Sequence, residues 1–359
     1  MNIFSRYLIR NLFLGFAAAA GLLIPLFSTF NLINELDDVS TGGYHWTQAF
    51  IVVLMSLPRT LIDLGPFIAL LGGIVGLGQL SKSLELTAIR SSGMSIFRIS
   101  MIVLCSGIFL TLSLGILDEW AASPLQQRAL QIKNAAMARS GDINNSLTPL
   151  WARKNNEYVT VKALDEDQQP TGIEIFYYNP DLSLSSYIYA SKATIQNTRM
   201  WMLHNVHLKQ WRNGSETLST MENMPWSSLF SGMNMVELTM PAESFSIFQL
   251  YHYIDYLKNT EQPCTEFQMA LWQKLGRPVL ILAMILLAVP FTFTNPRSSG
   301  LGGRLAMAVI VGLLTYISYQ ITLNLGLLLS FNAEATALSL PTLWLLIALG
   351  LVYRFNKLH

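Results

Sequence analysis

Charge is distributed very unevenly along this chain of 359 residues, and this feature restricts its possible folds more than any other. Residues 118–278 contain 13 of the 23 lysines and arginines and 16 of the 22 aspartates and glutamates. The segments on either side are almost wholly apolar, and only 13% of the chain is charged, against about a quarter in soluble domains. The pattern predicts a membrane region, then a soluble domain, then a second membrane region.

Six segments are long and apolar enough to cross a bilayer, whose core of about 30 Å needs roughly 20 helical residues. One of them, residues 49–80, is interrupted by Arg59 and Asp63. We expect residues 64–81 to be its buried part and residues 46–58 to lie at or above the headgroups. The other five contain no charged residue and cover residues 12–33, 99–117, 278–294, 305–331 and 335–353.

The flanking bases indicate how the spans are oriented. Nine lysines and arginines flank the spans on one side, and the two short loops on the other side contain none. The positive-inside rule therefore places both termini in the cytoplasm and the charged region on the outer side. We expect the first span to be retained, because no small-residue cleavage site follows it.

The charged region has a helical pattern at each end and a β pattern between. Helices are expected at about residues 124–139 and 246–258. From about residue 140 to 242, short segments rich in β-branched and aromatic residues alternate with turn signals such as Asn179-Pro180 and Asn213-Gly214. The fold class is thus a polytopic α-helical membrane protein with six transmembrane helices and an all-β, jellyroll-like domain inserted between the third and fourth spans.

Alternation within the β region predicts one inward-facing set of side chains. These either fill a closed core or line an apolar groove for acyl chains, which must be shielded from water. The set comprises Ile173, Ile175, Tyr177, Tyr187, Tyr189, Trp201 and Leu203.

The sequence contains no motif for catalysis, nucleotide binding or metal binding. It has no Gly-Lys pair and therefore no P-loop, and it has no H-E-x-x-H or G-x-S-x-G motif. His204 and His207 would face opposite sides of a strand, which disfavours a shared metal. The glycines of the second span are better explained by close helix packing than by a nucleotide loop; they are Gly72, Gly73, Gly76 and Gly78. We expect no catalytic residue, metal site or cofactor in this chain.

The loop between the second and third spans has the pattern of a short interfacial helix over about residues 81–93. Gly93 suits its C-terminal cap, and Glu85 is the only acidic residue on the predicted cytoplasmic side. Such a helix fits a groove on a soluble partner. The alternative is a surface helix whose carboxylate neutralises a neighbouring base, Lys82 or Arg90.

Five bases from three segments are expected near the outer membrane surface, where they can bind phosphate through charge-assisted hydrogen bonds. The alternative is ordinary snorkelling to lipid headgroups. Their convergence favours contact between two or three of them and a specific anionic lipid. The five are Arg59, Arg128, Lys133, Lys274 and Arg277.

The fifth span has a mixed face unlike that of a plain lipid anchor. Tyr316, Tyr319 and Gln320 lie at helical spacing, and Gly312 and Gly326 lie on the same span. With the first span it is predicted to form a lateral gate against a partner subunit. The alternative is that these polar groups hydrogen-bond within the chain's own bundle.

Taken together, these features resemble the LptF/LptG family of lipopolysaccharide-export permeases over essentially the whole chain. The best local match is the coupling motif Glu85-Leu-Thr-Ala-Ile-Arg-Ser-Ser-Gly93. The segment Leu150-Trp-Ala152 and a very short C-terminal tail make the chain more similar to the LptG branch. Further matches are Glu119-Trp120, Tyr256-Leu-Lys258, Trp272-x-Lys274-x-x-x-Pro278 and Pro296-Arg297-Ser298.

The resemblance implies a transport subunit of an ABC transporter, not an enzyme. It implies a heterodimer with the sister permease LptF, and an LptB ATPase dimer that binds the ATP and magnesium. The complex would extract lipopolysaccharide from the outer leaflet of the bacterial inner membrane and pass it to LptC and LptA through periplasmic β-jellyroll domains. The residues that would contact the ATPase are Glu85, Leu86, Ile89, Arg90 and Gly93.

One departure from the family and two rival classes bear on this interpretation. LptG relatives often carry lysines at the outer end of the first span, where this chain has Asn31, Asp37 and Asp38. A polytopic membrane enzyme that modifies a lipid at the periplasmic interface is the alternative function. A permease of the lipoprotein-releasing type is disfavoured, because that family has four spans.

Overall fold

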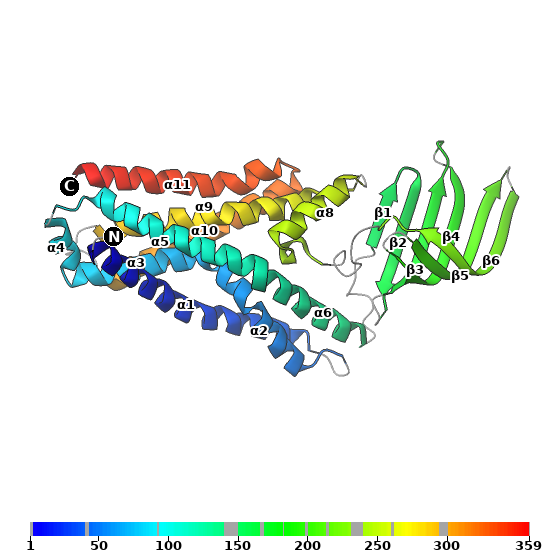
Figure 1. The fold of residues 1–359 in the computed structure, drawn as a ribbon, viewed down its shortest axis with the longest axis horizontal. Helices are drawn as coiled ribbons and strands as arrows, with labels where there is room; N and C mark the ends of the chain where they lie inside the picture. Colours follow the sequence, from blue (N-terminus) through cyan, green and yellow to red (C-terminus); the bar gives the residue numbers. More distant parts are fainter. Residues whose placement is uncertain are drawn as a thin grey trace.

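The structure is a computed structural model, in which a bundle of long helices is followed at one end by a curved β-sheet (Figure 1). Both termini lie at the opposite end of the bundle from the sheet (Figure 1). The described residues are 3–39, 43–91, 93–139, 150–165, 169–181, 183–197, 200–212, 215–230, 240–259, 262–293 and 301–358.

The described part of the chain contains six helical segments that could span a membrane, as the sequence predicts. Five are single helices or continuous helical runs that are long and apolar enough to span a membrane, and the sixth is a pair of helices bent by 63°. The spanning helices are α1 (Ile3–Asp37), the pair α2 (Trp46–Asp63) and α3 (Gly65–Lys82), α5 (Ile96–Leu117), α9 (Thr265–Phe293), α10 (Leu301–Leu328) and α11 (Ala333–Leu358).

The bend between α2 and α3 lies within the apolar segment of residues 49–80, directly after the two charged residues that interrupt it, Arg59 and Asp63. Pro66 lies in the first turn of α3 and has no backbone N–H, so it favours a new helix start at this position. Two thirds of the residues of α3 are buried, because α1, α9 and α10 pack around it. The short α4 (Glu85–Ser91) follows at the end that carries the termini.

The third span continues toward the sheet without a break in the helix. α5 passes through a π-helical turn, η1 (Asp118–Ala122), into α6 (Ser123–Arg139). A π turn inserts one extra residue into a helix and is frequent at functional sites. After the β-sheet segment in the chain, the 3₁₀ turn η2 (Ala242–Ser244) and α8 (Ile247–Asn259) precede α9.

Glycines allow α1 and α3 to pack with their backbones close together, which confirms the packing interpretation of the glycines in the second span. A Cβ atom added at Gly72 would lie 2.7 Å from the Cα of Phe16, and one added at Gly76 would lie 2.7 Å from the carbonyl oxygen of Asn11. Both distances are too short for any side chain. This close packing holds α1 against the central helix.

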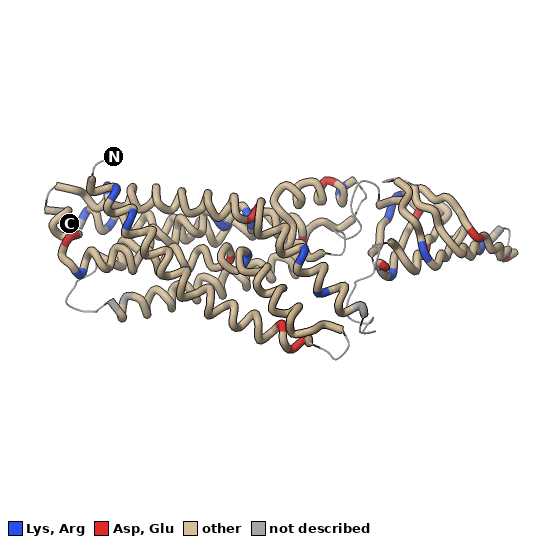
Figure 2. The backbone as a smooth tube through the Cα atoms, turned by 60° about the horizontal axis from the view of Figure 1, so that its bottom comes forward, with Lys and Arg blue, Asp and Glu red and all other residues tan. Residues whose placement is uncertain are grey.

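Charged residues are grouped along the backbone (Figure 2). They lie at the end of the bundle that carries the termini, around a group of helices toward the sheet, and on the sheet itself (Figure 2). Long stretches of helix between these places carry none, as expected for segments in contact with acyl chains.

The described residues of the inserted domain form one antiparallel six-stranded sheet in which each strand pairs with the next. Its buried face holds a compact apolar core that includes Ile173, Ile175 and Leu203, all fully buried. The strands are β1 (Leu150–Lys154), β2 (Glu157–Leu164), β3 (Pro170–Tyr178), β4 (Leu184–Ile195), β5 (Met200–Arg212) and β6 (Ser215–Ser227).

The inward-facing residues of β4 differ from the sequence prediction, whereas Trp201 and Leu203 of β5 are buried as predicted. Ile188 and Ala190 of β4 fill the core, so Tyr187 and Tyr189 lie on the opposite face, and their predicted inward position is wrong. In β5, Asn205 has a φ of +50° and interrupts the alternation, so that Leu203 and Val206 are both buried. Simple alternation does not detect such an irregularity, because it depends on the backbone conformation of a single residue.

The same irregularity affects the histidines of β5. His204 and His207 both lie outside the buried core, and their predicted placement on opposite faces is wrong. His204 has hydrogen-bond partners in Thr194 and Asn223. No group of three or more potential ligands gathers around a metal position in the described part of the chain.

Candidate functional site

A chain of alternating charges joins three helical segments at the level of the α2–α3 bend. Lys274 Nζ lies 2.7 Å from Asp118 Oδ2, and Arg59 Nη1 lies 3.4 Å from Asp118 Oδ1. Arg59 Nε and Arg277 Nη2 lie 3.4 and 2.9 Å from the same oxygen, Oδ1 of Asp63. Three cations thus share two carboxylates, and the network carries a net charge of +1.

The local structure explains why these groups meet. Arg59 and Asp63 are one turn apart on α2, so they share one face of that helix. The π turn of η1 includes Asp118, whose side chain is 8% exposed and lies between Arg59 of α2 and Lys274 of α9. Ser123 completes this centre by donating a hydrogen bond to Asp118 Oδ1.

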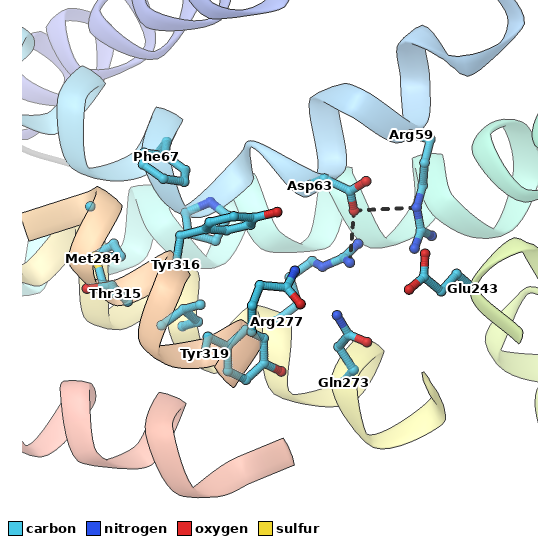
Figure 3. A pocket seen from close by; sticks show the side chains of 14 residues that line it. Arg59, Asp63, Phe67, Glu243, Gln273, Arg277, Met284, Thr315, Tyr316 and Tyr319 are labelled. Atoms are coloured by element: carbon cyan, nitrogen blue, oxygen red, sulfur yellow. Dashed lines mark ion pairs between the residues drawn. The ribbon is translucent and has the colours of Figure 1, made fainter. Parts of the chain in front are cut away.

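The network forms part of the wall of a cavity of about 200 Å³ between α2, α3, α9 and α10 (Figure 3). Asp63 lies between the guanidinium groups of Arg59 and Arg277, and Tyr316 and Tyr319 approach from α10 (Figure 3). The other lining residues are Pro66, Phe67, Glu243, Gln273, Leu280, Met284, Gly312, Thr315 and Gln320. The cavity therefore brings together two groups that the sequence predicted separately, the outer bases and the polar face of the fifth span.

Arg277 retains a donor inside this cavity wall. Its Nη1 atom is buried and has no hydrogen-bond partner among the described residues. A guanidinium carries five N–H donors, and a buried unpaired donor is unfavourable, so this atom can donate a hydrogen bond to an additional oxygen ligand at a net gain.

The other two predicted bases lie outside the cavity. Lys133 Nζ of α6 binds Asp38 at 2.7 Å and Glu35 at 2.9 Å, at the outer end of α1. These two ion pairs hold the acidic end of α1 beside α6. Arg128 is exposed on α6.

The polar residues of α10 have different environments. Tyr319 is 7% exposed and donates to the carbonyl oxygen of Ala337 on α11, at 3.4 Å. Tyr316 is 47% exposed, and Gln320 is half-buried. At Gly312 the helix lies directly against the ring of Phe67, where an added Cβ would be 2.9 Å from the ring.

At the opposite end, α4 is shorter than the predicted helix of residues 81–93. Leu84 has a φ of +61° and separates α4 from α3. Leu86 and Ile89 are buried within the chain, so they anchor α4 to the helix bundle. They are therefore not free to enter a groove on another protein. Glu85 is half-buried and accepts a hydrogen bond from Tyr7 Oη at 2.8 Å, and Gly93 has the positive φ of +92° expected of a helix cap. The side chain of Arg90 lies outside the described residues.

Sequence reasoning gave Asp118 too small a role. It is not among the candidate residues of the sequence analysis, yet it is the buried centre that joins α2 to α9 through Arg59 and Lys274. The sequence signal for this role is a carboxylate directly after an uncharged span, at a position where a lone charge would be costly to bury.

Comparison with known proteins identifies the family. The family model for the lipopolysaccharide export system permease LptF/LptG matches residues 6–354. This chain belongs to the LptF/LptG permease family. Membership of this family makes it a transport subunit and not an enzyme, and a multi-pass membrane protein.

Individual members of the LptF/LptG family are similar over nearly the full length. The lipopolysaccharide export system permease protein LptG of Escherichia coli K12 is 26% identical over 359 residues, which covers 98% of both chains. The LptG protein of Haemophilus influenzae is 26% identical over 322 residues, covering 89% of this chain and 90% of its own. The similarity therefore extends across both groups of helices and the inserted sheet.

Proposed function

We propose that this permease works as the LptG-type half of a lipopolysaccharide exporter. It extracts lipopolysaccharide from the outer leaflet of the bacterial inner membrane and passes it toward a periplasmic β-sheet bridge. The observation that carries the proposal is the cavity at the α2–α3 bend, where a buried guanidinium with an unpaired donor faces the polar side of α10.

The partners follow from the family. The sister permease LptF would pair with this chain, an LptB dimer would bind ATP and magnesium, and LptC and then LptA would receive the lipid. Both termini and α4 would face the cytoplasm, and the sheet would lie in the periplasm. This orientation is supported by the position of the termini and α4 at the end opposite the sheet, together with the positive-inside rule (Figure 1).

Fewer residues are proposed to contact phosphate than the five predicted bases. Lys133 and Lys274 each bind a carboxylate within 3 Å and do not line the cavity, so they serve mainly to hold helices together. Arg277 and Arg59 line the cavity and are the first candidates to bind substrate phosphate, and Arg128 is exposed and accessible.

The proposed lateral gate includes the cavity-lining face of α10. Tyr316 and Gln320 line the cavity, and Tyr316 is also exposed at the bundle surface, so a lipid that enters between α10 and a partner helix meets both. Tyr319 instead holds α10 to α11 through its hydrogen bond to Ala337.

Photo-crosslinking in the assembled transporter tests the proposal. A benzophenone amino acid placed at Tyr316 is expected to capture lipopolysaccharide, and the yield should fall when ATP drives transport. The matched control is Leu346, an equally apolar setting on α11 that is 66% exposed and does not line the cavity. Equal capture at both positions, or capture at neither, would contradict the proposed route.

A further inference from the structure

The Asp63 carboxylate occupies the position between two guanidinium groups that an external anion would need. Its Oδ1 oxygen serves both Arg59 and Arg277, at 3.4 and 2.9 Å. The two arginine side chains are 9% and 13% exposed, whereas that of Asp63 is 48% exposed. The carboxylate is therefore the most accessible member of this part of the network, and it can turn into water more readily than either arginine.

Asp63 satisfies the two arginines only in part. A single carboxylate oxygen is shared by both, while Arg277 Nη1 stays buried without a partner in the described part of the chain. A phosphate group presents three or four oxygens and can bind a guanidinium through two parallel hydrogen bonds. It could therefore bind Arg59 and both Nη atoms of Arg277 together, where Asp63 leaves one of them unpaired.

The cavity wall is electrically balanced as it stands. Its charged residues are two cations, Arg59 and Arg277, and two anions, Asp63 and Glu243, so their formal charges sum to zero. Glu243 is exposed and forms no ion pair with a described residue, and its carboxylate is turned toward the side of Arg59 (Figure 3). An anion added beside both carboxylates would be repelled, so it gains most by replacing the one that holds the arginines.

We propose that Asp63 is an internal counter-ion that a lipid phosphate displaces from Arg59 and Arg277, and that this exchange selects phosphate monoesters. A phosphodiester such as that of phosphatidylglycerol carries one negative charge, as Asp63 does, and so gains little from the exchange. A phosphate monoester carries up to two and has more free oxygens. This inference rests on the proposed function, because it assumes that lipopolysaccharide phosphate reaches this cavity.

The test measures lipid binding to the purified transporter in detergent. The probes are bisphosphorylated lipid A, dephosphorylated lipid A and phosphatidylglycerol, with inorganic phosphate as a competitor. The native complex is expected to prefer bisphosphorylated lipid A. Asp63→Asn and the smaller Asp63→Ser should each raise the affinity for phosphatidylglycerol by about tenfold, the effect of about one charged hydrogen bond, and so reduce the preference.

Glu243→Gln is the matched control, since it removes one negative charge from the same wall without touching an ion pair. Its effect should be about threefold or less, as for an exposed charge. Recovery of the assembled complex is measured for each variant, and two different substitutions at Asp63 guard against a folding defect in one.

The outcomes distinguish the counter-ion exchange at Asp63 from the phosphate site itself. If the native complex prefers bisphosphorylated lipid A and Asp63→Asn behaves like Glu243→Gln, the counter-ion exchange is wrong and the phosphate site stands. If the native complex binds bisphosphorylated and dephosphorylated lipid A equally, or if Arg277→Gln changes nothing, the phosphate site itself is wrong and the exchange falls with it. Competition by inorganic phosphate at concentrations similar to that of the lipid would overturn the assignment to a lipid headgroup.

Discussion

Asp118 shows how one buried carboxylate can connect distant parts of this permease. It lies in the π turn of η1, binds Lys274 of α9 and Arg59 of α2, and is itself 8% exposed at its side chain. Because two bases and Ser123 surround it, its charge is compensated inside the bundle. The residue thereby fixes the helix positions that shape the cavity.

Asp118→Asn is expected to destabilise the protein by about 3–5 kcal/mol, because it leaves Lys274 buried beside an uncharged group. The double variant Asp118→Asn, Lys274→Met removes both members of the pair and should recover much of this loss. The measurement is thermal unfolding of the purified complex. A double variant no more stable than the single one would show that the pair is not the source of the effect.

At the scale of the elements, α3 is the central helix and its glycines decide how closely α1 approaches. The two helices meet at Gly72 and Gly76, where an added Cβ would be 2.7 Å from backbone atoms of α1. Backbone atoms give way less easily than side chains, so this contact tolerates no larger residue.

Gly76→Ala should therefore lower the thermal stability of the complex, although alanine favours helix by about 1 kcal/mol over glycine. Gly21→Ala on α1 is the control, since nothing lies within 4 Å of an added Cβ there. We expect Gly21→Ala to be neutral or stabilising and Gly76→Ala to cost about 1–3 kcal/mol. Equal effects of the two substitutions would refute close packing as the role of Gly76.

The short helix α4 is the element that we expect to contact the ATPase. Its apolar side chains Leu86 and Ile89 face inward, so the contact depends on its exposed side and on Glu85. The hydrogen bond from Tyr7 shows that Glu85 also has a role within the chain.

Glu85→Ala is expected to weaken assembly with the ATPase, or uncouple ATP hydrolysis from transport, by about 1–3 kcal/mol. Tyr7→Phe removes the internal hydrogen bond and keeps the carboxylate, so it should leave coupling nearly intact. ATPase activity and lipopolysaccharide release are measured together for both variants. A Tyr7→Phe variant as defective as Glu85→Ala would indicate that Glu85 acts only within the chain.

At the scale of the whole molecule, the sheet lies beyond the end of the helices that is opposite the termini (Figure 1). Its apolar face is a filled core, in which Ile173, Ile175 and Leu203 are fully buried. We expect acyl chains that use this domain to pass along the edge of the core at β6, where Met224 is only half-buried.

Met224→Glu should slow lipopolysaccharide release and leave ATP hydrolysis intact, because a hydrated charge at this edge removes apolar surface that shields acyl chains, and each methylene left in water costs about 0.8 kcal/mol. Leu218→Glu is the control on the same strand, at a position that is already 64% exposed. Circular dichroism confirms that both variants are folded. Normal export by folded Met224→Glu would show that the lipid does not use this edge.

The sequence by itself determined the spans, the inserted sheet and the types of residue that could bind phosphate. These follow from local properties, namely the length of uncharged runs, the period of alternation and the side of the membrane on which bases gather. Even the break in the second span was visible locally, as Arg59 and Asp63 interrupting an apolar run of 32 residues.

Only the tertiary structure decided which of the five bases are available to a ligand. Lys133 and Lys274 are neutralised by carboxylates on helices distant in sequence, whereas Arg277 keeps an unpaired donor. The faces of His204 and His207 in β5 were likewise decided by the positive φ of Asn205 between them. The physical reason is that an ion pair forms between side chains brought within about 4 Å by helix packing, and the sequence pattern gives the charges but not the distances between them.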